Sequence, residues 1–550
     1  MATLVLPGSS TLAQTTFDYL GRVNNLPLER NMHGVGANVH TGFKPYLPEF
    51  LAGAVKTDSI ATAAYAFRSR KKSVDERSWF GRKARFQHLI EVDSADFYLS
   101  IDPILNVQIG SQRETDSSLY INTRGFAIHG RIGQRVFIYS DFRENQAKFP
   151  DYMEAYIRST GVVPGHGATK DFKGSGFDYA MASGYVSYMP SKYFHFRFGH
   201  GKNFIGDGYR SLLLSDGSFN YPFLRVTTQV WKIQYTNLFT SFQNIDDTQG
   251  SFAPHTYEGG YKKKFASFHY LSWNAAPRLQ VGFFEGILWQ SADSSSRRGF
   301  DLNYLNPVIF YRPVEFSLGS PDNAILGLNL KFKATDKVIV YAQGVADDIN
   351  LKRKDDLPLD TTVTTERKGF IQNKLGYQLG VHGFDLFGIA NLDVQAELNA
   401  VRPYTYAHKT PLQSYTHFAE PLAHPLGANF REWVFLADYR KNNWMLNARW
   451  VIARTGRDST SQQHYGSDIF KSDYDAQYGL LGFGNTLLQG QQVKISNFRL
   501  QVNYLINPSY QMNLFVGWMS RVAITDDKSM TTSMLFFGLK TRLDNTYDDF

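Results

Sequence analysis

The sequence predicts an all-β protein, a transmembrane antiparallel β-barrel of about 18 strands with a short N-terminal helical segment at its periplasmic end. Three observations predict this class. Apolar and polar residues alternate along many segments, these segments often end in Trp or Tyr, and short and long connections alternate between them. A soluble β-sandwich shares the alternation, but its strands are usually about five or six residues long. The segments seen here run about ten to thirteen residues, which fits tilted strands that cross a bilayer.

Composition agrees with a chain that meets both lipid and water. The 550 residues are 15% aromatic, yet the mean hydropathy is -0.32. Both values hold if one face of each strand contacts lipid and the other faces an aqueous lumen. The absence of cysteine excludes disulfides, thiolate metal sites and a cysteine nucleophile. The net charge of +8 is spread over single Lys and Arg residues, which argues against nucleic acid and favours anionic lipid or polysaccharide as partners.

The N-terminal part of the chain lacks the alternation. Residues 1–14 are interpreted as the remnant of a secretory signal peptide or as a disordered terminus. Residues 15–95 are expected to form an N-terminal helical segment, because residues 17–26 and 50–70 have helix-like spacing and residues 75–86 are rich in charge. We expect this segment to plug or brace the periplasmic mouth of the barrel.

Residues 96–550 are expected to form the barrel. The first strand is predicted near residues 96–110 and the last near residues 531–543. The final residue, Phe550, is a terminal aromatic of the kind that barrel-assembly machinery recognises on a last strand. Residues 544–549, just before it, no longer alternate cleanly.

The number of strands depends on one hairpin. Long polar stretches fall near residues 146–176, 203–220, 244–262, 290–321, 348–373, 402–429 and 455–492. A single strand over Phe223–Phe242 would put two consecutive long loops on opposite rims, so this run is expected to be a hairpin. The turn is predicted near Trp231 and Lys232, although no Gly or Asn-Gly pair marks it. The resulting count is even and places both termini on the periplasmic side.

Three stretches resemble a known family. Gly199–Arg225 (GHGKNFIGDGYRSLLLSDGSFNYPFLR) resembles the glycine-rich segment G-x-G-x-R-S-L-L-L-S-D of the Wzi-type capsule-assembly outer-membrane proteins. Asn306–Asn323 and Ala423–Phe430 resemble the Bacteroidota branch of that family, which includes proteins similar to the gliding-motility protein RemB. The resemblance implies an eighteen-stranded barrel in the cell outer membrane with a helical bundle at its periplasmic end. It also implies capsule assembly through polysaccharide binding or, for RemB-like members, a role in gliding motility and the type 9 secretion system.

Two segments are candidate ligand-binding sites. The first lies within Gly199–Arg225 and offers the hydrogen-bonding side chains His200, Lys202, Asp207, Tyr209, Arg210 and Asp216 for hydroxyls or uronate carboxylates. The alternative, which we favour, is that this loop folds into the lumen as a constriction with its charges paired to one another, because luminal polar groups must be satisfied. The second segment, Phe310–Asp322, presents Tyr311 and Arg312 in a proline-rich loop that could stack on a sugar. Its alternative is a loop that only covers the barrel mouth.

No motif indicates a metal site, a cofactor or catalysis. His408, His417 and His424 share one loop with Glu420, but their spacing matches no zinc pattern such as H-E-x-x-H. Neither Asp347-Asp348 nor Asp548-Asp549 has the ligand repeat of a calcium loop. No Ser-His-Asp, paired-carboxylate or nucleophile-elbow pattern stands out, so we expect no enzyme.

These patterns leave two classes of function open. The first is an outer-membrane barrel whose loops bind a surface polysaccharide for capsule assembly, or that serves the gliding and type 9 secretion machinery. Its expected partners are outer-membrane lipid and lipopolysaccharide, surface polysaccharide, and proteins of that machinery. The second is a diffusion porin for small solutes. A plugged barrel should pass little current in a planar bilayer, whereas a porin should pass a steady one.

Overall fold

The structure of the chain is a computed structural model. It describes residues 20–51, 77–245, 261–292, 298–307, 309, 322–348, 369–477, 482–526, 528–542, 545 and 547–550. The expectation for residues 1–14 therefore lies outside the described residues, as does most of the helical spacing expected over residues 50–70. Within the described ranges, no helix is long and apolar enough to span a membrane.

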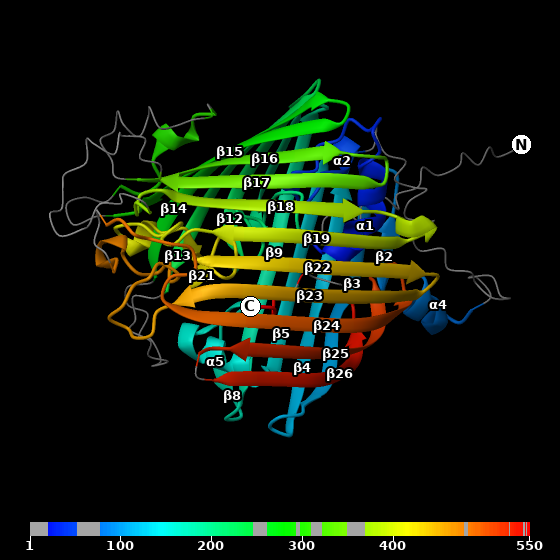
Figure 1. Cartoon of the computed structure of the whole chain (residues 1–550). Coiled ribbons are helices and arrows are strands. Elements are labelled where there is room, and N and C mark those ends of the chain that lie inside the picture. The colour runs from blue at the N-terminus through cyan, green and yellow to red at the C-terminus, as the bar shows by residue number, and fades with distance from the viewer. Residues whose placement is uncertain are drawn as a thin grey trace, which may run out of the picture.

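Eighteen antiparallel strands form a closed barrel in which each strand pairs with its neighbours in the chain and the last pairs with the first (Figure 1). They are β3 (Phe97–Gln112), β4 (Ser117–Ile132), β5 (Val136–Lys148), β9 (Gly176–Ser191), β10 (Phe194–Gly201), β12 (Tyr221–Val230), β13 (Ile233–Asn244), β14 (Lys262–Ala276), β15 (Leu279–Gln290), β16 (Asn323–Lys333), β17 (Val338–Asp348), β18 (Lys374–Gly383), β19 (Leu392–Val401), β22 (Phe430–Lys441), β23 (Trp444–Arg457), β24 (Gln491–Asn507), β25 (Met512–Ile524) and β26 (Ser529–Lys540). This confirms the predicted fold class and strand count.

Alternation in the sequence becomes alternation of the two barrel faces. On β25, Leu514, Val516 and Trp518 are exposed on the outer face, whereas Phe515 and Met519 are buried inside. Successive side chains of a strand point to opposite faces, so each strand presents an apolar row outward. The inward row carries most of the polar residues, and those are the residues that meet the contents of the lumen.

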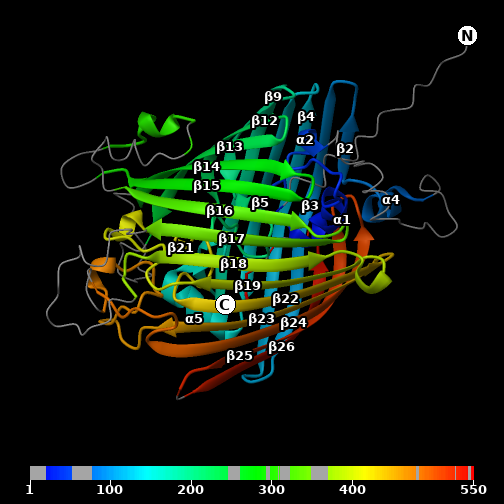
Figure 2. The same cartoon turned by 45° about the horizontal axis from the view of Figure 1, so that its top comes forward.

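The hairpin predicted from loop parity is confirmed. β12 and β13 pair antiparallel through Val230 and Ile233, and Trp231-Lys232 forms the turn between them. Trp231 has φ of 57°, so a non-glycine residue takes the left-handed conformation that this tight turn requires. Turns of this kind lie on one rim, which we call the inner rim. The long loops lie on the other, the outer rim (Figures 1 and 2).

The closing seam of the barrel is shared by two strands. β26 pairs only with the part of β3 from Asn106 to Gln112. The remaining part of the same edge pairs with β2 (Ile90–Asp93), which lies opposite Tyr98–Ile101. A short strand from before the barrel therefore completes the sheet where the last strand stops.

The remaining elements are short. They are α1 (Arg22–Met32), β1 (Phe43–Lys44), α2 (Pro48–Leu51), α4 (Trp79–Arg85), α5 (Asp151–Thr160), β6 (Val162–Val163), β7 (Gly167–Ala168), β8 (Lys170–Phe172), β11 (Phe204–Ile205), β20 (Thr416–His417), β21 (Glu420–Pro421) and the 3-10 turns η3 (Leu302–Leu305), η5 (Leu386–Gly388), η6 (Pro411–Gln413) and η7 (Asp473–Asp475). The short N-terminal helix is confirmed as α1. Figures 1 and 2 place α1, α2 and α4 at the inner rim, away from the long loops.

Helix α1 is held inside the barrel mouth by ion pairs to the wall. Arg22 lies 2.7 Å from Asp438 on β22, and Arg30 lies 2.5 Å from Asp393 on β19. Both acids point inward and are buried. The basic residues of the helix thus meet an acidic sector of the wall.

The C-terminal tail corrects one expectation. Phe550 does not lie on the last strand, because β26 ends at Lys540 and the chain then turns into the lumen. The Phe550 ring lies 4.7 Å from that of Tyr156 and 6.2 Å from that of Tyr152, both on α5 of an outer loop. Figures 1 and 2 mark the C-terminus within the barrel outline. The tail leaves the sheet because its acidic residues pair with luminal arginines, as described below.

Candidate functional site

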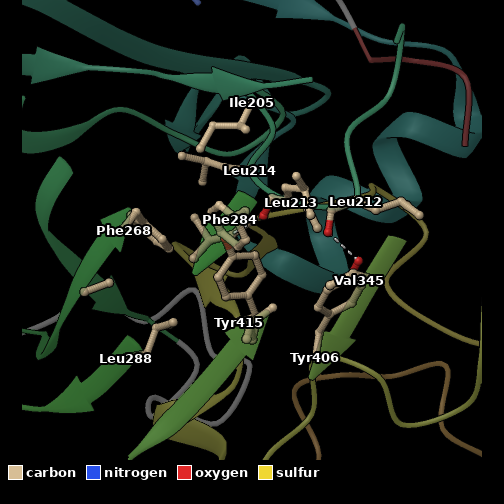
Figure 3. Packing of buried hydrophobic residues seen from close by; sticks show 14 of the residues in the cluster. Ile205, Leu212, Leu213, Leu214, Phe268, Phe284, Leu288, Val345, Tyr406 and Tyr415 are labelled. Atoms are coloured by element: carbon tan, nitrogen blue, oxygen red, sulfur yellow. Dashed lines mark hydrogen bonds between the residues drawn. The ribbon is translucent and has the colours of Figure 1, made fainter. Parts of the chain in front are cut away.

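The loop between β10 and β12, residues 202–220, folds into the barrel, and we call it the luminal loop. Its residues Leu212, Leu213 and Leu214 are fully buried and belong to the largest apolar cluster of the described residues (Figure 3). They pack with Phe268, Phe284 and Tyr415 from the wall and from another outer loop. Three consecutive apolar residues are buried here without strand alternation because the loop is enclosed on all sides. The loop folds into the lumen as expected, whereas the expected pairing of its charges with one another is treated below.

The backbone of the luminal loop is fixed by side chains of its surroundings. The Leu212 N–H donates to Gln343 Oε1 at 2.9 Å. The hydroxyls of Tyr406 and Tyr415 donate to the carbonyls of Leu212 and Leu213 at 2.7 and 2.6 Å, and Figure 3 shows the first of these bonds. Buried backbone groups need such partners, so these hydrogen bonds satisfy the backbone of the loop inside the core.

Arg210 of the luminal loop is the centre of a buried ion-pair network. Its Nη2 lies 2.9 Å from Glu432 on β22 and 2.9 Å from Asp549 of the tail. Glu432 also contacts His424 Nε2 at 2.7 Å, and the Tyr209 hydroxyl donates to Asp549 at 2.9 Å. Burial lowers the pKa of Arg210, but the two carboxylates outweigh it and raise the pKa well above its usual value. The network joins the loop, the wall and the tail.

Asp207 occupies a second network near the N-terminal segment. It accepts hydrogen bonds from Thr41 at 2.5 Å and Asn329 at 2.9 Å, and its nearest cation is Lys331 at 3.6 Å. Burial raises the pKa of Asp207, but Lys331 and the hydrogen bonds from Thr41 and Asn329 together outweigh it, and the net shift of the pKa is downward. Asp207, Tyr209 and Arg210 are therefore committed to structural contacts. Asp207 pairs with Lys331 of the wall, and Arg210 pairs with Glu432 of the wall and Asp549 of the tail. The expectation that the charges of this loop pair with one another is therefore not met for these residues.

Three luminal segments meet at Asn545. Its amide nitrogen donates to the Leu20 carbonyl at 3.0 Å and to Asp216 at 2.8 Å, and its oxygen accepts from the Arg22 N–H at 2.9 Å. The Tyr547 hydroxyl donates to the same Asp216 carboxylate at 2.6 Å. The N-terminal segment, the luminal loop and the tail are tied together at this point.

Beside this junction lies a cavity of about 120 Å³, which we call the luminal cavity. Three predicted ligand-binding residues line it, namely His200, Lys202 and Asp216. Its other lining residues are Leu20, Gly21, Pro45, Tyr139, Asp141, Arg143, His166, Met181, Ser183, Gly184, Tyr185, Arg197, Gly201, Asn220, Phe223, Arg542 and Asn545. The inward faces of β5, β9 and β10 form its wall, and the luminal segments form its other side.

The charges around the luminal cavity are unequal. Arg143, Arg197, Lys202 and Arg542 line it, but the only acids among its lining residues are Asp141 and Asp216. Arg143 and Arg542 share Asp141, at 2.9 and 3.1 Å, while the Arg197 Nε donates to Ser187 at 2.9 Å. Lys202 donates to the carbonyls of Gly165 and Asp216 at 2.7 and 3.1 Å.

An anionic group is the ligand chemistry that this lining suits. Arginine presents its donors in a planar fork that matches a carboxylate, and lysine adds a compact positive charge. Sequence reasoning missed Arg143, Arg197 and Arg542. Arg197 lies on the polar face of the alternating run at residues 193–201, so its inward position was already readable there.

The second predicted binding segment lies almost entirely outside the described residues. Tyr311 and Arg312 lie outside the described residues, as do all but the last of the residues over Phe310–Asp322. Asp322 itself is buried, 2.8 Å from Arg298 Nη1, and it accepts from the Tyr304 hydroxyl at 2.6 Å.

The three loop histidines lie apart, each with its own partners. His424 contacts Glu432, His417 Nε2 lies 3.1 Å from the Asn220 carbonyl, and His408 Nδ1 accepts from the Thr410 N–H at 3.3 Å. Burial lowers the pKa of all three, to about 3 for His417 and to about 4 for His408. Over the ranges that the structure describes, no three His, Asp or Glu side chains group as a metal site would require.

Comparisons with known proteins give a fold but no close relative. No family model and no curated protein matches the chain. Among solved structures, Wzi, an outer-membrane protein of group 1 capsule assembly in Escherichia coli titled a carbohydrate-binding β-barrel, is similar with a TM-score of 0.51. Identity is 12%, over 94% of this chain and 98% of that one. OprD of Pseudomonas aeruginosa gives a TM-score of 0.40 at 10% identity, over 80% and 94% of the two chains. OccAB2 of Acinetobacter baumannii gives 0.41 at 9%, over 81% and 98%.

The closed eighteen-stranded sheet and its likeness to Wzi show that the chain has the fold of an outer-membrane β-barrel. The likeness to the Wzi structure agrees with the sequence resemblance at the level of the barrel. The comparisons do not support the Bacteroidota branch or the similarity to RemB.

Proposed function

We propose that this barrel is a cell-surface binding protein that holds an acidic polysaccharide, in a role of the capsule-assembly type, and that it is neither a diffusion pore nor an enzyme. The observation that carries the proposal is the state of the lumen. The luminal loop, the tail and the N-terminal segment meet there and leave the luminal cavity, whose lining is basic.

The filled lumen argues against a porin. Porins keep a polar, water-filled channel, whereas Leu212, Leu213 and Leu214 here form part of a dry apolar cluster inside the barrel. The buried contacts of Arg210 with Glu432 and Asp549 fix the filling in place. Removing one partner of such a pair costs about 3–5 kcal/mol, because the other charge is then buried without compensation.

The chemistry of the luminal cavity supports an acidic sugar. Lys202 and Arg197 can provide hydrogen bonds to a uronate carboxylate, and His200 and Tyr185 provide groups suited to hydroxyls and ring faces. Wzi, with a similar fold, is titled carbohydrate-binding, which makes a sugar the first ligand to test. The expected partners of the barrel are thus surface polysaccharide, outer-membrane lipid and lipopolysaccharide.

Binding of an acidic capsular polysaccharide to the purified barrel tests the proposal, with neutral dextran as the reference. Lys202→Ala is expected to weaken binding by about tenfold to a hundredfold, since a hydrogen bond to a charged group contributes about 1.5–3 kcal/mol. Lys192→Ala, at an exposed turn of the inner rim, removes the same charge and should leave binding unchanged. Equal losses in the two variants, or no preference for the acidic polymer, would contradict the proposal.

Two alternatives are separated by other measurements. A role as an accessory of gliding motility or type 9 secretion rests on the sequence resemblance alone, and enrichment of that machinery on co-purification in mild detergent would favour it. A diffusion porin would pass a steady current in planar bilayers, whereas the proposed barrel stays closed.

A further inference from the structure

Residues 77–93, which we call the rim segment, lie outside the circuit of eighteen strands. The segment contains α4 and β2 and runs along the inner rim (Figures 1 and 2). It is tied to the turn between β24 and β25: the Asn507 amide nitrogen and the Tyr510 hydroxyl donate to the Lys83 carbonyl at 2.8 and 3.1 Å. The Ser509 hydroxyl donates to the Phe86 carbonyl at 2.8 Å. The position of the segment on the barrel is therefore fixed.

The second half of the rim segment faces the same way as the outside of the barrel. Ile90 lies opposite Ile101 of β3 and Val92 lies opposite Leu99. Residues directly opposite each other in a ladder point to the same face, and the β3 residues between these two, such as Ser100, are buried inside. Ile90 and Val92 are therefore part of the outer, lipid-facing surface, and each is almost half exposed.

The first half of the rim segment exposes its aromatic residues. In α4, Trp79 is 60% exposed and Phe80 is 73% exposed. The helix begins with Ser78 as its N-cap, whose hydroxyl oxygen accepts from the Gly81 N–H at 3.1 Å, so these side chains sit on an ordered element. Isolated exposed apolar residues are common on protein surfaces. Two adjacent large aromatic side chains exposed on a fixed helix instead indicate a surface that contacts another molecule or the membrane.

The charges around α4 are all positive, and the acidic residues of the rim segment, Glu91 and Asp93, lie on β2. Residues 77–90 contain Arg77, Arg82, Lys83 and Arg85 and no acidic residue. A short helix that combines exposed Trp and Phe with Arg and Lys has the composition of an interfacial membrane helix. The aromatic rings suit the depth of the headgroups, and the cations suit lipid phosphates.

We propose that α4 lies in the headgroup layer of the inner leaflet and binds anionic phospholipid there. Two features favour lipid over a protein partner. The helix leads directly into β2, whose Ile90 and Val92 continue the lipid-facing surface. The same rim carries other exposed tryptophans, Trp231 and Trp444, at the level where aromatic residues mark the membrane boundary.

Single-cysteine labelling of the full chain tests this placement, because the chain has no cysteine of its own. Phe80→Cys carries an environment-sensitive fluorophore in vesicles of phosphatidylethanolamine with or without phosphatidylglycerol. Lys337→Cys, at an exposed turn of the same rim, serves as the aqueous control, and Leu535→Cys, on the outer face of β26, serves as the hydrocarbon control.

The label at position 80 is expected to be quenched by lipids that carry a nitroxide at headgroup depth and to be shielded from aqueous iodide. Adding Lys83→Glu and Arg85→Glu should abolish the part of this shielding that depends on phosphatidylglycerol. If the label at position 80 is as open to iodide as the label at position 337, α4 does not meet the membrane and the proposal fails. Shielding in native outer membranes but not in vesicles would also overturn it, because the surface would then belong to a protein partner.

Discussion

Replacing two adjacent carboxylates of the tail, Asp548→Asn with Asp549→Asn, tests how the barrel lumen is closed. Asp549 contacts Arg210, and Asp548 contacts Arg449 and Arg499, the latter at 2.5 Å. The change keeps the size and shape of both side chains but removes their charge. It therefore addresses the ion pairs while leaving the packing of the tail nearly unchanged.

The magnitude follows from the burial of these groups. Asp549 and Arg210 are almost completely buried, and breaking such a pair by removing one charge costs about 3–5 kcal/mol. This shifts the equilibrium between the docked and the released tail by about a hundredfold to a few thousandfold. Asn545 of the tail lines both the luminal cavity and a second cavity of about 110 Å³, so release of the tail joins the two spaces.

Single-channel recording in planar bilayers is the assay. The unaltered barrel should remain closed, and the double variant should show intermittent openings that become more frequent in high salt, which screens the remaining charges. Asp116→Asn is the matched control, because Asp116 is exposed in an outer turn and has φ of 49°, a conformation that Asn tolerates. A folded double variant that stays as quiet as the control would refute the idea that the tail carboxylates keep the lumen closed.

Three further predictions address pH, the tail and the lipid face. Burial raises the pKa of Glu420 to about 8, although the hydrogen bond from the Gly165 N–H at 2.6 Å favours the charged form, so the folded loop around Glu420 is most stable below about pH 4.5 and loses stability as pH rises towards 8. Glu420→Gln should flatten the pH dependence of amide exchange at Gly165, and an unchanged profile would contradict the assignment. Burial raises the pKa of Asp548, but Arg449 and Arg499 together with the hydrogen bonds to this carboxylate outweigh it and bring the pKa to about 2, so tail docking should weaken between about pH 4 and 2 and channel openings should appear there in the unaltered barrel. Leu535→Arg, at a position 58% exposed on the outer face, should lower the free energy of unfolding in lipid vesicles by up to about 2–4 kcal/mol, and no loss would argue that this face does not meet lipid.

The fold could be predicted because its signals are local. Alternation along β25 and similar strands shows which residues face outward, and loop parity alone located the turn at Trp231. The path of the tail had no such signal. Asp549 is 339 residues away from Arg210, and a pairing over that distance leaves no pattern in either stretch of sequence. The sequence therefore predicted the end of the last strand near residue 543 but not the luminal position of Phe550.

The candidate site was only partly predictable on similar grounds. The polar residues of Gly199–Arg225 were expected either to bind a ligand or to be paired inside the lumen. Sequence reasoning could not distinguish Lys202, which lines the luminal cavity, from Arg210, which is buried in an ion-pair network. The difference depends on which wall residue lies opposite each of them, such as Glu432 opposite Arg210. That is a property of the closed barrel, because strands distant in sequence bring those residues together.

The lumen is filled according to charge. The acidic sector on β19 and β22 receives the arginines of α1, and the basic sector on β23 and β24 receives the carboxylates of the tail. Each inserted segment thus carries the sign opposite to its sector, which satisfies charges that would otherwise be costly to bury. The sector formed by β5 and β10 differs, because its arginines face the luminal cavity and cations outnumber acids among the lining residues. Pairing of opposite charges places α1 and the tail in their sectors. By the same rule, the sector of β5 and β10, with its excess of cations, can accommodate an acidic ligand from outside the chain.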